Sequence, residues 1–90
     1  MDVILSKNAK RAVLTLPLYL SEKLEFWIRS VNEFGLEKVR QSKGFHDEPL
    51  GHRLGQRSVH LNRAYRAIYI IHKNGIIEFV EIIEVNKHDY

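Results

Sequence analysis

The C-terminal third of the chain, residues 57–90, constrains the fold most, because its apolar residues alternate as they do in β-strands. Val59 and Leu61 are separated by polar and cationic residues, the pattern of a strand with one buried face. Two further apolar runs follow, and we expect strands at about 57–61, 65–72 and 76–85. The turn signal Lys73-Asn74-Gly75 separates the last two, since Asn-Gly readily adopts a tight hairpin turn. The sequence therefore predicts a block of three consecutive strands.

The last of these strands has an irregular pattern. Glu78, Glu81 and Glu84 recur at every third position, which is closer to a helical period than to the period of two in a strand. The β-branched residues around them and the preceding turn favour a strand. A β-bulge would reconcile the two signals, because one extra residue shifts the alternation.

The N-terminal half predicts a strand followed by helices. Val3-Ile4-Leu5 is a short apolar run, and Ser6 is a good N-cap for a helix that Pro17 ends. A second helix begins between residues 18 and 21 and reaches Phe34, where Gly35 is placed for a C-cap. A short helix is expected at 36–41, and the segment 42–55, rich in glycine, is expected to be a loop. Trp27 is interpreted as a core residue.

These elements predict an α+β fold in a single domain, residues 1–90. A helical hairpin packs on a twisted, mostly antiparallel four-stranded sheet in the order β-α-α-β-β-β. Ninety residues support one modest core. The absence of cysteine excludes a disulfide framework and a thiolate zinc site. We see no apolar run long enough for a signal peptide or membrane span, so we expect a cytoplasmic protein.

The charge distribution points to a polyanionic ligand. Residues 51–77 contain no acidic side chain but carry five cations and three histidines, which are Arg53, Arg57, Arg63, Arg66, Lys73, His52, His60 and His72. Such a segment suits nucleic acid, whose phosphates dominate affinity. A solvated basic surface is the alternative interpretation.

Four residues form the candidate catalytic set: His60, Arg66, His88 and Tyr90. Metal-free RNA cleavage needs a base to take the 2′-hydroxyl proton, an acid for the leaving oxygen and cations for the phosphorane. Histidine serves as either acid or base near neutral pH, and arginine pairs bidentately with phosphate. Tyrosine stacks on a base or binds phosphate. Arg57, Arg63 and Lys87 are candidate contacts for the RNA backbone.

These residues also have alternative interpretations. We find no spaced set of Asp, Glu and His ligands and no glycine-rich phosphate loop, so we expect neither a metal nor a cofactor. His60 is alternatively an ordinary cross-strand residue. Arg66 is alternatively the ion-pair partner of Glu78 or Glu84 on the adjacent strand.

The order and spacing of these segments resemble the RelE/ParE superfamily of type II toxin–antitoxin toxins over nearly the whole chain. Ile4-Leu5-Ser6-Lys7-Asn8-Ala9-Lys10-Arg11 resembles the family's opening segment, and Ala64-Tyr65-Arg66-Ala67-Ile68-Tyr69 contains its Tyr-Arg-x-x-Tyr pattern. The ending Glu84-Val85-Asn86-Lys87-His88-Asp89-Tyr90 resembles the C-terminal segment of ribosome-dependent members. Ser58 stands where some relatives have lysine, and we find no glutamate like the strand-two residue of the YoeB branch.

The resemblance implies a bacterial mRNA interferase that cleaves messenger RNA on the ribosome and is silenced by an antitoxin. Arg66 would be the phosphate-binding arginine, and His60 falls where relatives carry a catalytic lysine or histidine. His88 and Tyr90 resemble the C-terminal pair of the RelE, YoeB and HigB branches. Two alternatives stay open: a ParE-type inhibitor of DNA gyrase, and an inactive domain that only binds an antitoxin.

Overall fold

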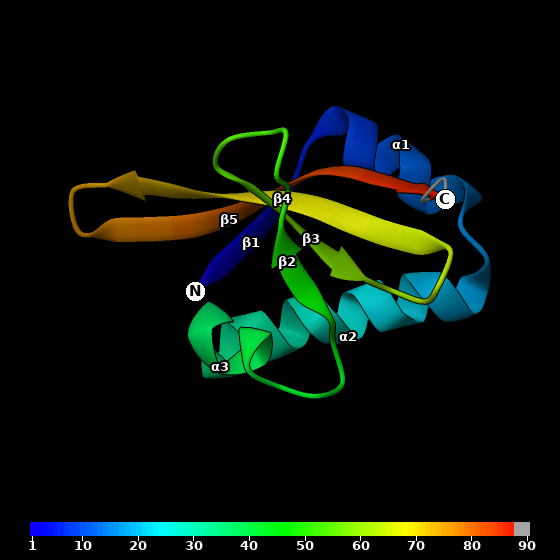
Figure 1. The fold of residues 1–90 in the computed structure, drawn as a ribbon, viewed down its shortest axis with the longest axis horizontal. Helices are drawn as coiled ribbons and strands as arrows, with labels where there is room; N and C mark the ends of the chain where they lie inside the picture. Colours follow the sequence, from blue (N-terminus) through cyan, green and yellow to red (C-terminus); the bar gives the residue numbers. More distant parts are fainter. Residues whose placement is uncertain (88–90) are drawn as a thin grey trace.

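The computed structural model describes residues 1–87 and shows an α+β domain with one five-stranded sheet (Figure 1). The strands are β1 Asp2–Leu5, β2 Asp47–Pro49, β3 Gln56–His60, β4 Tyr65–Asn74 and β5 Ile77–Lys87. The helices are α1 Lys7–Thr15, α2 Leu18–Phe34 and α3 Leu36–Arg40. The strand order is β1-β5-β4-β3-β2, with β1 parallel to β5 and the other pairs antiparallel. Within the described residues, no helix is both long and apolar enough to cross a membrane.

The helix boundaries follow the sequence signals. The Ser6 hydroxyl accepts a hydrogen bond from the Ala9 amide (3.1 Å) and donates one to the Ile83 carbonyl (2.9 Å), so this cap also ties α1 to β5. The helix ends before Pro17, because the residue preceding a proline avoids the α region. Gly35, at a φ of 86°, ends α2, a backbone conformation that glycine adopts without steric cost.

One apolar core holds the helices on the sheet. Leu20, Leu24, Trp27 and Val31 form the buried side of α2, and they pack with inward-facing residues of β3, β4 and β5. Trp27 is fully buried, with its ring centroid 5.2 Å from that of Tyr69 on β4. The interpretation of Trp27 as a core residue is confirmed.

The long hairpin β4–β5 contains the expected bulge. Ile68 pairs with Glu84 while the next residue, Tyr69, pairs with Ile82, so one residue of β5 has no opposite partner. The bulge puts Glu81 and Glu84 on the same face of β5, which reconciles their spacing. The turn itself falls one residue later than predicted, at Gly75 and Ile76, with positive φ at Gly75.

The four-stranded prediction is wrong by one strand. Residues 47–49 lie in the segment predicted to be a loop, yet they pair antiparallel with β3 as the edge strand β2. Pro49 is tolerated because an edge strand leaves one row of backbone groups unpaired. This strand extends the sheet on the side where His60 lies.

The second face of the sheet, opposite the helices, is only partly open. The loop 50–55 folds back through the hydrogen bonds Leu50 N–H to Gln56 O (2.9 Å) and Gln56 N–H to Arg53 O (3.1 Å). Ser58 and its cross-strand partner Ile68 are fully buried on this face. Alternation with buried Val59 and Leu61 would place Ser58 on a polar face, but the structure buries it. The open part of this face begins at His60.

Candidate nucleic-acid interface

Three strands place a row of polar side chains across the open part of the second face. His60 on β3 is the direct partner of Arg66 on β4, and Arg66 is the direct partner of Asn86 on β5. Directly opposed residues in antiparallel strands point to the same side of the sheet. Their chain neighbours Val59, Ala67 and Val85 point the other way, into the core. His60 and Arg66 therefore lie side by side on the same face of the sheet.

Arg66 is held by a hydrogen-bonded chain of side chains. Its Nε donates to Asn86 Oδ1 at 3.4 Å, and Asn86 Nδ2 donates to Glu84 Oε2 at 2.8 Å. The ion-pair partner of Glu84 is Arg53, at 2.8 Å. Asn86 thus stands between Arg66 and Glu84, its alternative partner, and within residues 1–87 the guanidinium is oriented without an ion pair to a carboxylate. A guanidinium so placed is suited to bidentate binding of phosphate oxygens.

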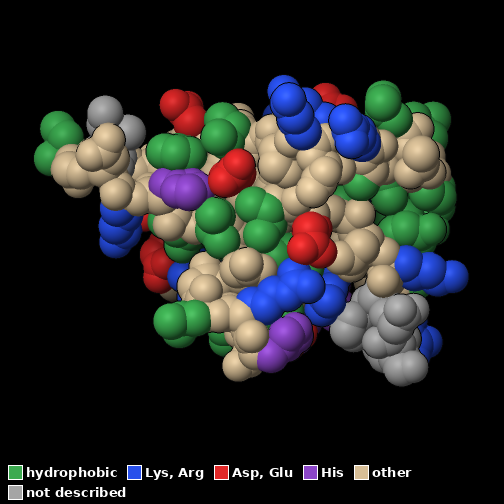
Figure 2. All heavy atoms as spheres, turned by 90° about the horizontal axis from the view of Figure 1, so that it is seen from above, with side chains coloured by type: hydrophobic (Ala, Val, Ile, Leu, Met, Phe, Trp, Pro, Cys, Tyr) green, Lys and Arg blue, Asp and Glu red, His purple; other side chains and the backbone are tan. Residues whose placement is uncertain are grey.

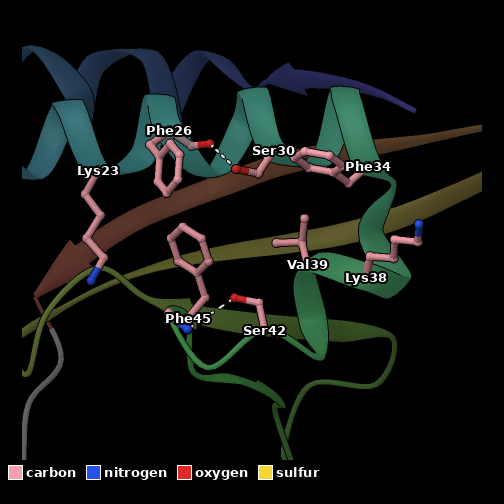
Figure 3. A pocket seen from close by; sticks show the side chains of 9 residues that line it. Lys23, Phe26, Ser30, Phe34, Lys38, Val39, Ser42 and Phe45 are labelled. Atoms are coloured by element: carbon pink, nitrogen blue, oxygen red, sulfur yellow. Dashed lines mark hydrogen bonds between the residues drawn. The ribbon is translucent and has the colours of Figure 1, made fainter.

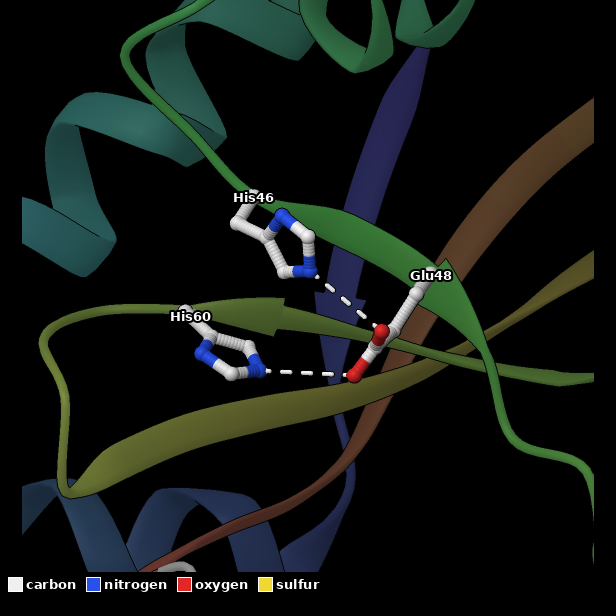
Figure 4. Close-up of side chains that lie close together, drawn as sticks. All are labelled: His46, Glu48 and His60. Carbon is white, nitrogen blue, oxygen red and sulfur yellow. Dashed lines mark hydrogen bonds and ion pairs between the residues drawn. The ribbon is translucent and has the colours of Figure 1, made fainter.

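A carboxylate that the sequence analysis did not single out lies beside this row. Glu48 on β2 has Oε2 at 3.3 Å from His46 Nε2 and Oε1 at 3.6 Å from His60 Nε2 (Figure 4). The two imidazole rings lie edge to face, 5.0 Å apart. The predicted lack of an Asp, Glu and His ligand set therefore does not hold, because strand pairing brings three such residues together. A signal existed: His46 and Glu48 have the two-residue spacing of one strand face.

The histidines affect the charge state of Glu48. Its hydrogen bond with His46 lowers the pKa of the Glu48 carboxyl below the ordinary value, and the nearby imidazoles of His46 and His60 add to this effect. Partial desolvation acts in the opposite direction but is smaller. Glu48 is therefore a carboxylate, ready to accept hydrogen bonds, across the neutral pH range.

Arg57 occupies a different environment. It points to the helix side, where its Nε donates to Asp47 Oδ1 at 2.8 Å, and the Tyr69 hydroxyl donates to Asp47 Oδ2 at 2.5 Å. Burial and the Asp47 hydrogen bond raise the pKa of Tyr69 well above its usual range. Arg40 Nε lies 3.9 Å from the same carboxylate. The structure gives Arg57 a structural ion pair, and its predicted contact with RNA stays a prediction.

The other predicted phosphate contacts lie at the same end of the sheet as His60 and Arg66. Arg63 is exposed in the connection between β3 and β4, and Lys87 is exposed at the end of β5, opposite Tyr65. Asn62, also in that connection, accepts hydrogen bonds from the Ala64 and Tyr65 amides and so fixes the turn. His88 and Tyr90 lie outside the described residues.

In the folded protein, acidic residues from other segments offset part of the positive charge of the basic segment 51–77. Acidic residues from other segments pair with its members: Asp47 with Arg57, Glu84 with Arg53, and Glu81 with His72. Figure 2 shows the resulting mixture, with acidic and basic side chains interspersed over the face in view. Three further cations, Arg63, Arg66 and Lys87, lie at the end of the sheet that carries His60, and this end is the candidate interface.

A separate apolar groove lies between α2 and the segment 38–45, with a volume of about 430 Å³ (Figure 3). Phe26 and Phe34 are each more than half exposed along it, and the Phe45 ring packs 5.9 Å from Phe26. Two cations, Lys23 and Lys38, line its sides. Phe45 directly precedes His46, so the groove adjoins the strand that carries Glu48.

Comparison with known proteins shows the fold. No protein-family model and no curated protein matches the chain. Among solved structures, a YoeB/ParE toxin from Agrobacterium tumefaciens matches at 21% identity and a TM-score of 0.70, covering 99% of this chain and 100% of that one. The YoeB dimer from Staphylococcus aureus matches at 18% identity and a TM-score of 0.71, covering 100% of this chain and 98% of that one. The archaeal RelE–RelB complex from Pyrococcus horikoshii OT3 matches at 22% identity and a TM-score of 0.67, covering 96% of this chain and 92% of that one. The chain has the fold of RelE/ParE-superfamily toxins.

Proposed function

We propose that this protein is the toxin of a type II toxin–antitoxin system and cleaves messenger RNA on the ribosome. The observation that carries the proposal is the row of His60, Arg66 and Asn86, with Glu48 beside it, on the open end of the sheet. Imidazole, guanidinium and carboxylate are the groups that metal-free attack by a 2′-hydroxyl requires.

His60 serves as the general base in this proposal. It takes the proton of the ribose 2′-hydroxyl as the 2′-oxygen attacks phosphorus, and the imidazolium that forms faces the Glu48 carboxylate at 3.6 Å. Glu48 thereby stabilises the charged ring and holds its orientation, as a carboxylate does for the histidine of a serine protease. General base catalysis of this kind contributes about 10²–10⁴-fold.

Arg66 stabilises the phosphorane, because its fork of N–H donors matches two phosphate oxygens. The bond from phosphorus to the 5′-oxygen then breaks, and an acid donates a proton to that oxygen. We assign this step to His88 and substrate stacking to Tyr90, on the resemblance of the C-terminal segment. The products are a 2′,3′-cyclic phosphate and a 5′-hydroxyl end.

The competing function is ParE-type inhibition of DNA gyrase, which does not require the row of His60, Arg66 and Asn86 with Glu48 beside it. The two functions are separated by adding the protein to a coupled translation system, mapping message ends, and running a gyrase supercoiling assay in parallel. We expect discrete cuts in translated messages and unimpaired supercoiling. Intact messages with inhibited gyrase would establish the ParE-type function. If the protein neither cuts messages nor inhibits gyrase, the remaining function is that of an inactive domain that binds an antitoxin.

We further propose that the groove between α2 and residues 38–45 binds the cognate antitoxin. Exposed Phe26 and Phe34 suit an amphipathic segment with apolar anchors, and Lys23 and Lys38 favour acidic residues beside them. The structures of YoeB with YefM and YafQ with DinJ are toxin–antitoxin complexes of the same fold.

This partner is tested by titrating the purified antitoxin into Phe26→Ser and Phe34→Ser variants. The matched control is Leu14→Ser, since Leu14 is 85% exposed on α1 away from the groove. We expect each groove variant to bind at least about tenfold more weakly, the loss of one apolar anchor. Unchanged affinity in both variants would place the antitoxin elsewhere.

A further inference from the structure

Strand pairing turns three residues of the edge strands toward one point. The His60 amide donates to the His46 carbonyl at 2.9 Å, so these two histidines lie opposite each other where β2 and β3 begin to separate. Glu48 is two residues after His46 and therefore on the same face. One ligand atom from each side chain lies within 4.8 Å of the other two.

The separations fit a shared metal ion better than optimal hydrogen bonds. Charge-assisted N–H···O bonds are about 2.7–2.9 Å long, whereas the Glu48 oxygens are 3.3 and 3.6 Å from the two Nε2 atoms. Ligands about 2.0–2.1 Å from a tetrahedral ion are separated by about 3.3 Å. The geometry points to a zinc-type site in which His46 Nε2, His60 Nε2 and the Glu48 carboxylate are the ligands.

The donor set selects the class of metal. Imidazole with carboxylate suits Zn²⁺, Co²⁺ and Ni²⁺, while Mg²⁺ and Ca²⁺ prefer sites made of oxygen ligands. Three protein ligands leave a fourth position for water. The side chains of His46 and Glu48 are 66% and 48% exposed, so an ion reaches them without unfolding of the protein.

Such an ion regulates the site rather than driving its chemistry. Bound zinc occupies the Nε2 of His60 and the carboxylate that supports it, so His60 loses the orienting partner of its base function. This consequence rests on the proposed function: zinc inhibits RNA cleavage, and removal of zinc by a chelator restores it. The binding site itself does not depend on that function.

Binding is measured with the full-length protein free of any polyhistidine tag. Zinc chloride is titrated by calorimetry, and cobalt chloride is titrated while the visible d–d absorption is recorded. We expect one saturable site per chain and the intense absorption of four-coordinate Co²⁺. His46→Ala and Glu48→Gln each weaken Zn²⁺ binding by at least about tenfold, the order expected for loss of a site-defining group.

The matched control is His52→Ala, because His52 is an exposed histidine of the loop 50–55, outside the cluster. It retains wild-type binding. The site is refuted if the wild-type protein shows no saturable binding, or if His46→Ala binds Zn²⁺ as tightly as the His52→Ala control. Far-UV circular dichroism confirms that each variant is folded.

A second measurement separates the metal site from its consequence. Message cleavage in the translation system is followed with and without one equivalent of Zn²⁺, in wild type and in His46→Ala. Zinc inhibits the wild-type protein and has at least about tenfold less effect on the variant. Zinc binding without any cleavage activity, in either condition, refutes the proposed function while leaving the site intact. Zinc binding with undiminished cleavage refutes the inhibition.

Discussion

Asp47 and Glu48 are adjacent in the chain, and the pleat of β2 sends them to opposite faces of the sheet. The Asp47 side chain is 2% exposed and is bound by Arg57 and Tyr69. The Glu48 side chain is 48% exposed, and its ion pairs within residues 1–87 are with His46 and His60. The same functional group therefore meets two environments within a single residue step.

The difference in exposure between Asp47 and Glu48 indicates that the first carboxylate contributes to folding and the second is available to a ligand. A buried carboxylate with two donors is required by its partners, because removing it leaves a cation and a hydroxyl without compensation. An exposed carboxylate beside imidazoles contributes little to folding, because solvent screens it. In the proposed function Glu48 supports catalysis, whereas Asp47 links β2, β3 and β4 from the core side through Arg57 and Tyr69. The predictions below test this division.

The largest effect is expected from Glu48→Gln, which keeps the shape of the side chain and removes its charge. We expect kcat for message cleavage to fall by about 10²–10⁴-fold. KM should change little, because Glu48 acts through His60 rather than on the substrate. The free energy of unfolding should stay within about 0.5 kcal/mol of wild type. Comparable losses in stability and activity would show that Glu48 has a structural role instead.

Asp47→Ala should have the opposite effect to Glu48→Gln, with its main loss in the stability of the fold. We expect a loss of about 3 kcal/mol in the free energy of unfolding, the lower end for a broken buried pair because the Arg57 side chain is 21% exposed. Urea unfolding followed by circular dichroism measures it. Glu37→Ala is the control, since Glu37 pairs with Arg40 at 79% exposure and should cost less than about 0.5 kcal/mol. Equal costs in the two variants would contradict the account.

Contacts with the RNA backbone should appear in the salt dependence of binding. Arg63→Ala and Lys87→Ala should each reduce the slope of log K against log salt concentration by about 0.7, the value for one single-strand phosphate. Lys10→Ala, an exposed cation of α1, is the control and should leave the slope unchanged. Filter binding to a single-stranded oligonucleotide gives the slopes. An unchanged slope in both interface variants would remove these residues from the RNA site.

The smallest effect concerns pH. The pKa of Glu48 is lowered in the folded protein, chiefly by the His46 hydrogen bond, so the contribution of its charge to stability is present above the ordinary glutamate pKa of 4.5. That contribution is lost as the pH falls through the folded-state pKa. The difference in unfolding free energy between wild type and Glu48→Gln should therefore shrink from about pH 6 to about pH 3. If this difference in unfolding free energy grows as the pH falls, the pKa of Glu48 is raised in the folded protein and not lowered.

Most of the fold was predictable because local signals agreed with one another. Ser6, Pro17 and Gly35 mark helix ends for backbone reasons that no tertiary contact overrides. The bulge between β4 and β5 followed from the spacing of the β5 glutamates, whereas the register that pairs His60 with Arg66 came from the structure.

The edge strand β2 and Glu48 were not predictable by the same reasoning. Three residues are too few to show a period, and Pro49 with its neighbouring glycines signals a loop. Ser58 is fully buried, which strand alternation alone does not report, because it does not show what covers a strand face. The pairing of Arg57 with Asp47 was hidden because the acid lies ten residues earlier, outside the acid-free segment.

Single-turnover cleavage of message on purified, programmed ribosomes tests the central claim most directly. The wild-type, Glu48→Gln and Asp47→Asn proteins are compared, with each rate normalised to the folded fraction measured under the same conditions. We predict that Asp47→Asn retains close to the wild-type rate per folded molecule while Glu48→Gln loses about 10²-fold or more. Wild-type cleavage by Glu48→Gln, with loss of activity in folded Asp47→Asn, would place the chemistry on the other face of the sheet and contradict the account.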